Sequence, residues 1–314
     1  MPRAQPEQPL VSVIVPVRDG EPTIADCLDA ILATDYPPDR REILVVDNGS
    51  SDGTAALIQA RPVRYLREPK RGVSNARNRG IAESRGEILA FVDADCLVEP
   101  QWLAELVRPF ENSEVGAVGG DLKHTPPTTA AERQAARLLG NWQRFAFTSN
   151  PAYPITANAA YRRDVLERIG GFDPHMPRAQ DVELGLRFQE RSGRRLAYAE
   201  NATARHRNRA TQLGFFRQQL GWAYGAGLVG AKYEALGGDP VNPPRIREIT
   251  RTARGLGIVL LAGLRRRGRR EWIEDAWFDL LRQVAWWIGA RSGLRRGARI
   301  WRPPSRGAPP GRSA

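Results

Sequence analysis

The chain has 314 residues, of which 41% are hydrophobic and 26% are charged, a composition that fits one large core or two modest ones and excludes a largely disordered protein. No run of about 18 apolar residues is present and no apolar stretch opens the chain, so we expect neither export nor a membrane-spanning helix, and a cytoplasmic location. The two cysteines, Cys27 and Cys96, have no Cys or His at metal-ligand spacing, which argues against a disulfide framework or a zinc site.

The net charge of +12 arises entirely in the C-terminal part of the chain. Of the 47 Lys and Arg residues, 17 follow residue 240, against 5 of the 35 Asp and Glu residues. The preceding part therefore holds 30 of each and is neutral. The overall pI of about 10.5 does not describe what that neutral part binds.

Strand and helix signals alternate along the neutral part. Residues 11–17 form a β-branched run that predicts a buried strand, and residues 22–32 carry one apolar face at helical spacing. The pattern repeats with a strand at 42–46 and a helix at 54–60. Further signals predict a strand at 63–66, a helix at 73–84, a strand at 87–92, a helix at 102–110, a strand at 115–120 and a helix at 132–147. The alternation predicts an α/β fold with a mostly parallel, Rossmann-like sheet flanked by helices.

Residues 1–240 are expected to form one domain, with a ligand-binding half at about 10–120 and a second half at 121–240. Residues 241–314 form a basic tail in which five arginines between 265 and 270 precede apolar residues at helical spacing over 272–288. That pattern is typical of an amphipathic helix on an anionic membrane surface, and equally of a helix packed on the domain with solvated arginines. No recognised nucleic-acid module accompanies the charge, so no nucleic acid is expected as a partner. Residues 302–314 are rich in Pro, Gly, Ser and Arg and are predicted to be disordered.

Three predicted strands end in turns that carry aspartates: Asp19, Asp47 and the pair Asp93 and Asp95. Ligands of open α/β sheets bind beyond the carboxyl ends of the strands, so these side chains mark the expected site. Two carboxylates two residues apart can hold a hard divalent cation such as Mg²⁺ or Mn²⁺, although a solvated acidic loop has the same sequence.

The Asp47 turn and the basic cluster that opens the next predicted helix each have a binding interpretation beside a structural one. Asp47 can accept hydrogen bonds from a base or a ribose, or it can close an Asx turn before the next helix. The basic cluster at residues 70–80, which includes Arg77, can face phosphate groups or form a solvated helix face.

Four blocks, in this order, resemble the inverting family 2 glycosyltransferases of the GT-A fold: VSVIVPV at 11–17, VVDNGSSDGT at 45–54, ARNRG at 76–80 and FVDAD at 91–95. The resemblance continues through TANAAYRR at 156–163, GGFD at 170–173 and QDVEL at 180–184, and so covers about residues 10–230. It implies a GT-A fold with a C-terminal helical extension, and transfer of a sugar from a nucleotide-sugar donor to an acceptor hydroxyl by direct displacement. It also implies dependence on Mg²⁺ or Mn²⁺.

The resemblance assigns roles position by position. It implies that the donor is bound by Pro16, Val17, Asp47, Arg77 and Asp93, that the metal is held by Asp95 and His206, and that Gln180, Gly171 and Asn158 lie on the acceptor side. Asp93 would act through the ribose or metal-bound water.

The resemblance also implies the general base. The family has a Glu-Asp pair where this chain has Gln180-Asp181, so Asp181 is the expected base and the contribution of the family's Glu is in doubt. Without the resemblance, the preferred explanation of Asp181 and Glu183 is a helix N-terminus, which favours acidic residues.

Two other functions compete with sugar transfer. A sugar-nucleotide nucleotidyltransferase uses a similar sheet and metal carboxylates, but no Gly-rich phosphate loop follows the first predicted strand. A catalytically decayed, basic membrane-surface protein is disfavoured by the intact Asp47, Asp93, Asp95 and Asp181 and left open by Gln180. The peripheral location, if the tail binds lipid, would be the inner face of the membrane. The nucleobase, the sugar and the acceptor are not readable from the sequence.

Overall fold

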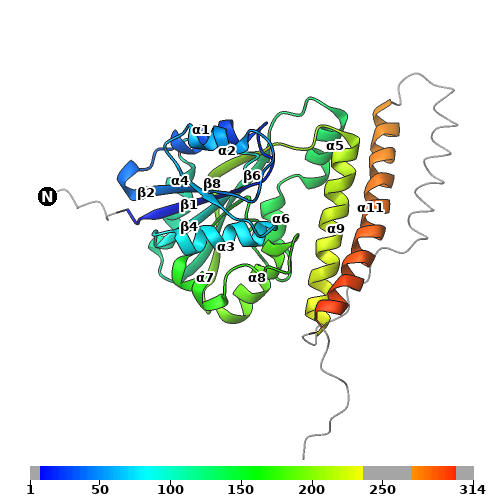
Figure 1. Cartoon of the computed structure of the whole chain (residues 1–314). Helices are drawn as coiled ribbons and strands as arrows, with labels where there is room; N and C mark the ends of the chain where they lie inside the picture. Colours follow the sequence, from blue (N-terminus) through cyan, green and yellow to red (C-terminus); the bar gives the residue numbers. More distant parts are fainter. Residues whose placement is uncertain (1–7, 236–269, 302–314) are drawn as a thin grey trace, which may run out of the picture. The chain divides into compact units, whose positions relative to one another are not determined.

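The computed structural model describes residues 8–235 and 270–301 (Figure 1). These residues form two compact units, one of residues 8–126 with 139–208 and the other of residues 127–138 with 209–235 and 270–301. The boundary expected near residue 240 therefore differs from the observed one, because the helix that begins at Gln212 packs on the C-terminal helix. The expected disordered end at 302–314 and the arginine cluster before residue 270 lie outside the described residues.

One eight-stranded sheet organises the first unit, in the order β3-β2-β1-β4-β7-β6-β8-β5. Its first half, β3 to β4, is parallel throughout, and its second half combines the antiparallel pairs β4-β7, β6-β7 and β5-β8 with the parallel pair β6-β8. The strands are β1 (Val11–Val17), β2 (Arg41–Asp47), β3 (Arg64–Arg67), β4 (Ile88–Val92), β5 (Cys96–Val98), β6 (Val115–His124), β7 (Asn158–Arg162) and β8 (Arg195–His206).

Helices cover both faces of this sheet (Figure 1). One face packs on α1 and α4 through residues such as Leu28 and Trp102, and the other packs on α3, α7 and α8 through residues such as Ala76, Val165 and Leu184. The helices of this unit are α1 (Ile24–Leu32), η1 (Pro38–Arg40), α2 (Thr54–Gln59), α3 (Val73–Glu83), α4 (Trp102–Val107), η2 (Arg108–Glu111), α6 (Trp142–Thr148), α7 (Arg163–Ile169) and α8 (Gln180–Arg191). The strands β1 and β4 are buried on both faces, as their continuous apolar sequences predict.

The single helix expected over 132–147 is two helices, α5 (Ala130–Leu139) and α6. Gly140 separates them with a φ of 47°, in the left-handed region that favours glycine. Asn141 then caps α6, because its side chain accepts a hydrogen bond from the backbone N–H of Arg144 at 2.9 Å. The apolar spacing predicted helix on both sides and missed the break.

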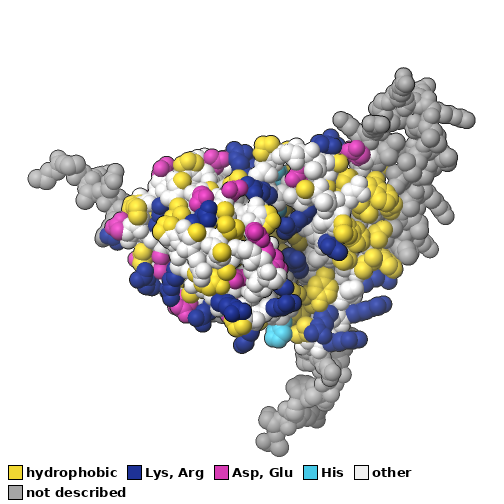
Figure 2. Space-filling model, turned by 45° about the horizontal axis from the view of Figure 1, so that its top comes forward, with side chains coloured by type: hydrophobic (Ala, Val, Ile, Leu, Met, Phe, Trp, Pro, Cys, Tyr) yellow, Lys and Arg dark blue, Asp and Glu magenta, His cyan; other side chains and the backbone are white. Residues whose placement is uncertain are grey.

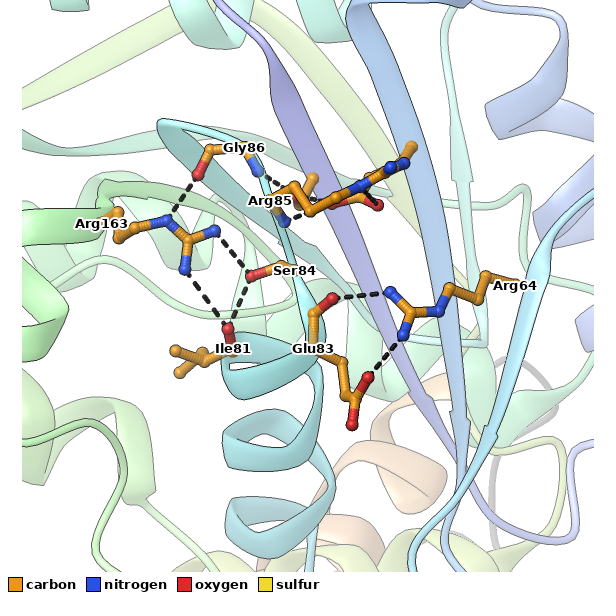
Figure 3. Close-up of polar contacts among 9 residues, drawn as sticks. Arg64, Ile81, Glu83, Ser84, Arg85, Gly86 and Arg163 are labelled. Atoms are coloured by element: carbon orange, nitrogen blue, oxygen red, sulfur yellow. Dashed lines mark hydrogen bonds and ion pairs between the residues drawn. The ribbon is translucent and has the colours of Figure 1, made fainter.

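A polar network fixes the turn between α3 and β4 (Figure 3). Arg163, the first residue of α7, donates to the carbonyl oxygen of Gly86 at 2.8 Å and to Ser84 Oγ at 3.0 Å. The N–H of Gly86 donates to Ser12 Oγ at 2.7 Å, and Ser12 donates to Glu42 at 2.6 Å. The network joins β1, β2, the α3–β4 turn and α7. It lies at the amino ends of the parallel strands, opposite the Asp-bearing turns at their carboxyl ends.

The second unit contains α5, α9 (Gln212–Ala235) and α11 (Arg270–Ile300). Helices α9 and α11 pack closely against each other. At Gly227, Gly289 and Gly293 the backbones are so near that a Cβ atom would overlap backbone atoms of the partner helix. Figure 2 shows hydrophobic side chains, with Lys and Arg among them, gathered over these two helices. No helix in residues 8–235 or 270–301 is long and apolar enough to cross a membrane.

Replacing Arg163 with Met should lower the free energy of unfolding by about 1–3 kcal/mol, because it removes charged donors from partly buried oxygens of Gly86 and Ser84. Urea denaturation measures this change. The matched control is Arg85→Met in the same network, where the side chain is 75% exposed and its ion pair with Glu42 should contribute less than about 1 kcal/mol. Equal losses in the two variants would contradict the structural role given to Arg163.

Candidate active site

Asp47 lies at the carboxyl end of β2 and is buried. Its Oδ1 accepts a hydrogen bond from the N–H of Ser50 at 2.8 Å, and its Oδ2 accepts one from the hydroxyl of Tyr65 at 3.0 Å. The Asp47 side chain therefore holds the turn before α2, although the N-cap of that helix is Gly53 and not Ser50 or Ser51. Binding of a nucleoside is compatible with it, since each carboxylate oxygen has a second lone pair.

Pro16 and Val17 end β1 beside Asp47, with Val17 at the same register as Asp47 in the parallel pair. Both are buried. Asp19 follows with a φ of 50° and accepts a hydrogen bond from the N–H of Ser51 at 2.8 Å. The turns after β1 and β2 are thus hydrogen-bonded to each other.

Arg77 is 2% exposed and donates to Asp93 Oδ1 at 2.8 Å. Its guanidinium also lies over the ring of Phe172, 5.4 Å from the centroid. The solvated-face interpretation of Arg77 is therefore wrong. The Nε and Nη1 atoms of Arg77 are buried without a hydrogen-bond partner, an arrangement that suits an anionic ligand beside Asp93.

Asp95 and His206 are brought together by strand pairing. Cys96 of β5 lies opposite His206 of β8, which places His206 Nε2 3.6 Å from Asp95 Oδ1. The N–H of Arg207 donates to the backbone oxygen of Asp95 at 2.9 Å and fixes the register. No group of three or more His, Cys, Asp and Glu side chains within the described residues could hold a metal without other ligands.

Asp95 and His206 nevertheless fit a Mg²⁺ or Mn²⁺ ion that is shared with a substrate. Such ions are held by one or two carboxylates, with phosphate oxygens and waters completing the coordination. His206 Nδ1 is buried without a hydrogen-bond partner, and Asp95 is only 18% exposed. Protein ligands alone are too few, so any tight site would depend on a phosphate-bearing ligand.

Asp181 lies in the first turn of α8. The N-cap residue of that helix, Ala179, has a φ of 54°, which is a strained value for a residue other than glycine. Desolvation by burial raises the pKa of the Asp181 carboxyl, and the nearby Arg77 guanidinium opposes the shift. One carboxylate oxygen accepts a hydrogen bond from the N–H of Val182 at 2.9 Å. Gln180 has its Oε1 buried without a partner. The helix-start interpretation of Asp181 is correct, and burial also perturbs the pKa of its carboxyl, as is common at functional sites.

Two residues expected on the acceptor side have structural positions. Asn158 is fully buried, with its amide donating to the carbonyl oxygens of Asp121 and Ala202 and its Oδ1 accepting from Trp102. Gly171 has a φ of 63° and lies in the turn after α7. The side chain of Asn158 has no free polar group, so we leave it out of the acceptor site, whereas an acceptor-side position of Gly171 stays a prediction.

The sequence did not predict two asparagine side chains that fix loops of the site through hydrogen bonds to the backbone. The side chain of Asn48 donates to the backbone oxygens of Glu68 and Lys70 and accepts from Gly72, which fixes the loop before α3. Asn78 both donates to and accepts from the backbone of Phe172, the residue under Arg77. The only sequence signal for these contacts was the position of each asparagine directly after a motif residue, Asp47 or Arg77. The backbone groups that they bind are distant in sequence and could not be predicted.

Comparison with known proteins decides the family. The family model of Glycosyl transferase family 2 matches residues 12–170. The chain belongs to this family. It is 36% identical over 206 residues to "Glycosyltransferase AglE" of Haloferax volcanii, an alignment that covers 63% of this chain and 67% of that protein. It is 30% identical to "Probable glycosyltransferase YdaM" of Bacillus subtilis, over 73% of this chain and 58% of that protein.

Solved structures agree on the fold. The mannosyltransferase PcManGT from Pyrobaculum calidifontis, solved in complex with GDP-Man and Mn²⁺, superposes with a TM-score of 0.62 at 22% identity and covers 90% of this chain and 88% of that one. The expected GT-A fold with C-terminal helices is therefore confirmed, and the chain is a glycosyltransferase. Membership in the family also removes the nucleotidyltransferase alternative.

Proposed function

We propose that this glycosyltransferase transfers a sugar from a nucleotide-sugar donor to an acceptor hydroxyl with inversion at the anomeric carbon. The observation that carries the proposal is the convergence of Asp47, Asp93, Asp95 and Asp181 at the carboxyl edge of one sheet, with the buried Arg77 between two of them. The GDP-Man and Mn²⁺ bound by PcManGT support a donor and a metal of this kind.

In this proposal the donor occupies the edge after β1, β2 and β4. Asp47, with Pro16 and Val17, bounds the nucleoside, and Asp93 is held by Arg77 beside the ribose and the diphosphate. Asp95 and His206 would hold Mg²⁺ or Mn²⁺ with the phosphate oxygens. The metal would neutralise the charge that develops on the departing nucleoside diphosphate.

Asp181 accepts the proton of the acceptor hydroxyl while that oxygen attacks the anomeric carbon. The new carbon–oxygen bond forms as the bond to the diphosphate breaks, and no covalent enzyme intermediate is needed. A raised pKa suits this role, because a carboxylate that holds a proton more tightly is a stronger base. Gln180 keeps hydrogen-bonding capacity next to this base without adding a second negative charge.

We also propose that the second unit binds an anionic membrane surface. Residues 280–300 of α11 contain Arg282, Arg291, Arg295, Arg296 and Arg299 and no acidic residue. The large apolar side chains exposed on α9 and α11 are Leu213, Tyr233, Trp277 and Ile288. Basic and apolar side chains on one helix pair are the composition of interfacial helices.

The donor and the metal are tested together. We expect one nucleotide sugar among GDP-mannose, UDP-glucose and UDP-N-acetylglucosamine to raise the melting temperature when Mn²⁺ is present. Release of the nucleoside diphosphate should stop in excess chelator and return on addition of Mn²⁺. Full turnover in excess chelator would remove the metal from the mechanism.

Asp95→Asn and Asp181→Asn should each lower transfer by about 100-fold or more, for different reasons. Loss of a metal ligand weakens donor binding in the presence of Mn²⁺, whereas loss of the base leaves donor binding near normal. Calorimetric titration with the donor separates the two. The matched control is Asp164→Asn on α7, whose carboxylate is 53% exposed. Near-normal transfer by folded Asp181→Asn would disprove the base assignment.

The membrane proposal predicts sedimentation with vesicles that contain phosphatidylserine, and less sedimentation at high salt. Replacing Arg295, Arg296 and Arg299 with Gln should weaken binding about 100-fold, at about 1 kcal/mol for each arginine. The control replaces Arg85, Arg108 and Arg195, which are exposed in the first unit, and makes the same change in net charge. Equal effects of the two triple variants would show that the second unit has no special affinity for the membrane.

A further inference from the structure

Several buried polar atoms around Asp181 have no hydrogen-bond partner. They are Nε and Nη1 of Arg77, the hydroxyl oxygen of Tyr161 and Oε1 of Gln180. Arg77 and Asp181 influence each other electrostatically, as do Tyr161 and Asp181. Unsatisfied buried polar groups are rare in folded proteins, so a cluster of them beside the proposed base needs a functional explanation.

Tyr161 is the member of this cluster to which neither the sequence nor the family comparison gave a role. It lies on β7, is fully buried, and packs edge-to-face against Phe91 and Phe188 at centroid distances of 6.1 and 6.4 Å. Phe91 in turn contacts Phe172, which lies under Arg77. A continuous aromatic layer therefore leads from Arg77 to Tyr161 on one face of the sheet.

The same face of α8 carries the base and packs on Tyr161. Asp181, Leu184 and Phe188 are spaced at i, i+3 and i+7, which places them on one side of the helix. Leu184 and Phe188 are fully buried in the core cluster that includes Tyr161. The side of α8 that bears the Asp181 carboxyl therefore faces the Tyr161 side of the sheet.

A phenylalanine at position 161 would keep the aromatic packing without burying a hydroxyl. An unpartnered buried hydroxyl destabilises a fold, and the hydroxyl of Tyr161 contributes no hydrogen bond to this one. Its presence is explained if it gains a partner during catalysis. Burial raises the pKa of Tyr161, so the group stays protonated and can act as a hydrogen-bond donor.

The charged and titratable groups that face Asp181 come from several elements. Arg77 of α3 favours the ionised carboxyl and Asp93, after β4, disfavours it. Tyr153 and Tyr161 have pKa values raised by burial first and by the negative charge of Asp181 second. Both tyrosines are neutral at physiological pH, so Arg77 is the nearby charge that favours ionisation of Asp181.

We propose that Tyr161 is a positioning residue for the base, and that its hydroxyl donates a hydrogen bond to the ionised carboxylate of Asp181 when the donor is bound. This inference rests on the proposed role of Asp181. The bond would hold one carboxylate oxygen while the other faces the acceptor hydroxyl. It would also favour the ionised form that accepts the proton.

The test is Tyr161→Phe, with Tyr36→Phe as the matched control. Tyr36 is also buried, but its hydroxyl donates to the backbone oxygen of Pro9 at 2.6 Å. We expect Tyr161→Phe to lower kcat for nucleoside diphosphate release at least about tenfold, with the KM for the donor unchanged. The acidic limb of the kcat profile should move to higher pH, because the ionised carboxylate loses a donor. The melting temperature should stay the same or rise, whereas Tyr36→Phe should lower it and leave the pH profile unchanged.

A purely structural role would instead lower the melting temperature of Tyr161→Phe without moving the acidic limb, and would overturn the inference. A parallel measurement needs no turnover: the pKa of Asp181 is followed by carbon NMR of protein labelled at the aspartate carboxyls, with the donor and diamagnetic Mg²⁺ present and the signal assigned through Asp181→Asn. The pKa of Asp181 should be higher in Tyr161→Phe than in the wild type, and an unchanged value would also overturn the inference.

Two outcomes separate this inference from the proposed function. If Asp181→Asn keeps full activity, the proposed base fails. If Asp181→Asn is inactive and Tyr161→Phe matches the wild type, only the role of Tyr161 fails.

Discussion

The active site depends on the insertion of β7 between β4 and β6. Antiparallel pairing on both sides of β7 turns the sheet from a parallel half into a mixed half, and Asn158 secures the point where β7 meets the end of β4. The amide of Asn158 bonds β6 and β8 through Asp121 and Ala202 and accepts the indole N–H of Trp102. A fully buried amide with these bonds fixes the second half of the sheet against the carboxyl end of β4. That arrangement is what brings residues of β8 and α8 to the Asp-bearing turns.

The buried charge of Arg77 is only partly compensated within the protein. Arg77 is almost wholly buried and satisfies one carboxylate, yet two of its nitrogen atoms have no partner. A buried ion pair rarely stabilises a fold more than a hydrophobic pair would, because desolvation offsets the attraction. An anion bound there would satisfy the unpaired donors of Arg77. Relief of their cost in the free protein would then add to the affinity for the diphosphate that the proposed function requires.

The sequence predicted what is local and failed where distant segments meet. The strand at 11–17 coincides with β1, since its β-branched run is buried on both faces, and the Asp-bearing turns follow from the strand ends. Gly140 was passed over, because apolar spacing continues on both sides of the break. The strand β8 gave no clear signal, since Glu200 and Asn201 interrupt its apolar residues and its pairing with β6 is bulged. Only the family resemblance pointed to His206, because its place beside Asp95 comes from pairing across more than a hundred residues.

The second unit shows the same limit in a different form. The apolar spacing over 272–288 predicted a helix, and α11 extends to Ile300, but the spacing did not indicate which side is covered. Gly289, Gly293 and Gly297 recur every four residues and therefore form one stripe, and each lies against α9. Packing through glycines brings the two backbones close and leaves larger side chains, such as Trp277 and Ile288, at the margins of the contact.

The arginines in the last turns of α11 lie at exposed positions outside the glycine stripe. A helix pair joined in this way can hold its partner and still present basic and apolar side chains outward, so the two interpretations of the tail as a packed helix and as a surface-binding helix are compatible.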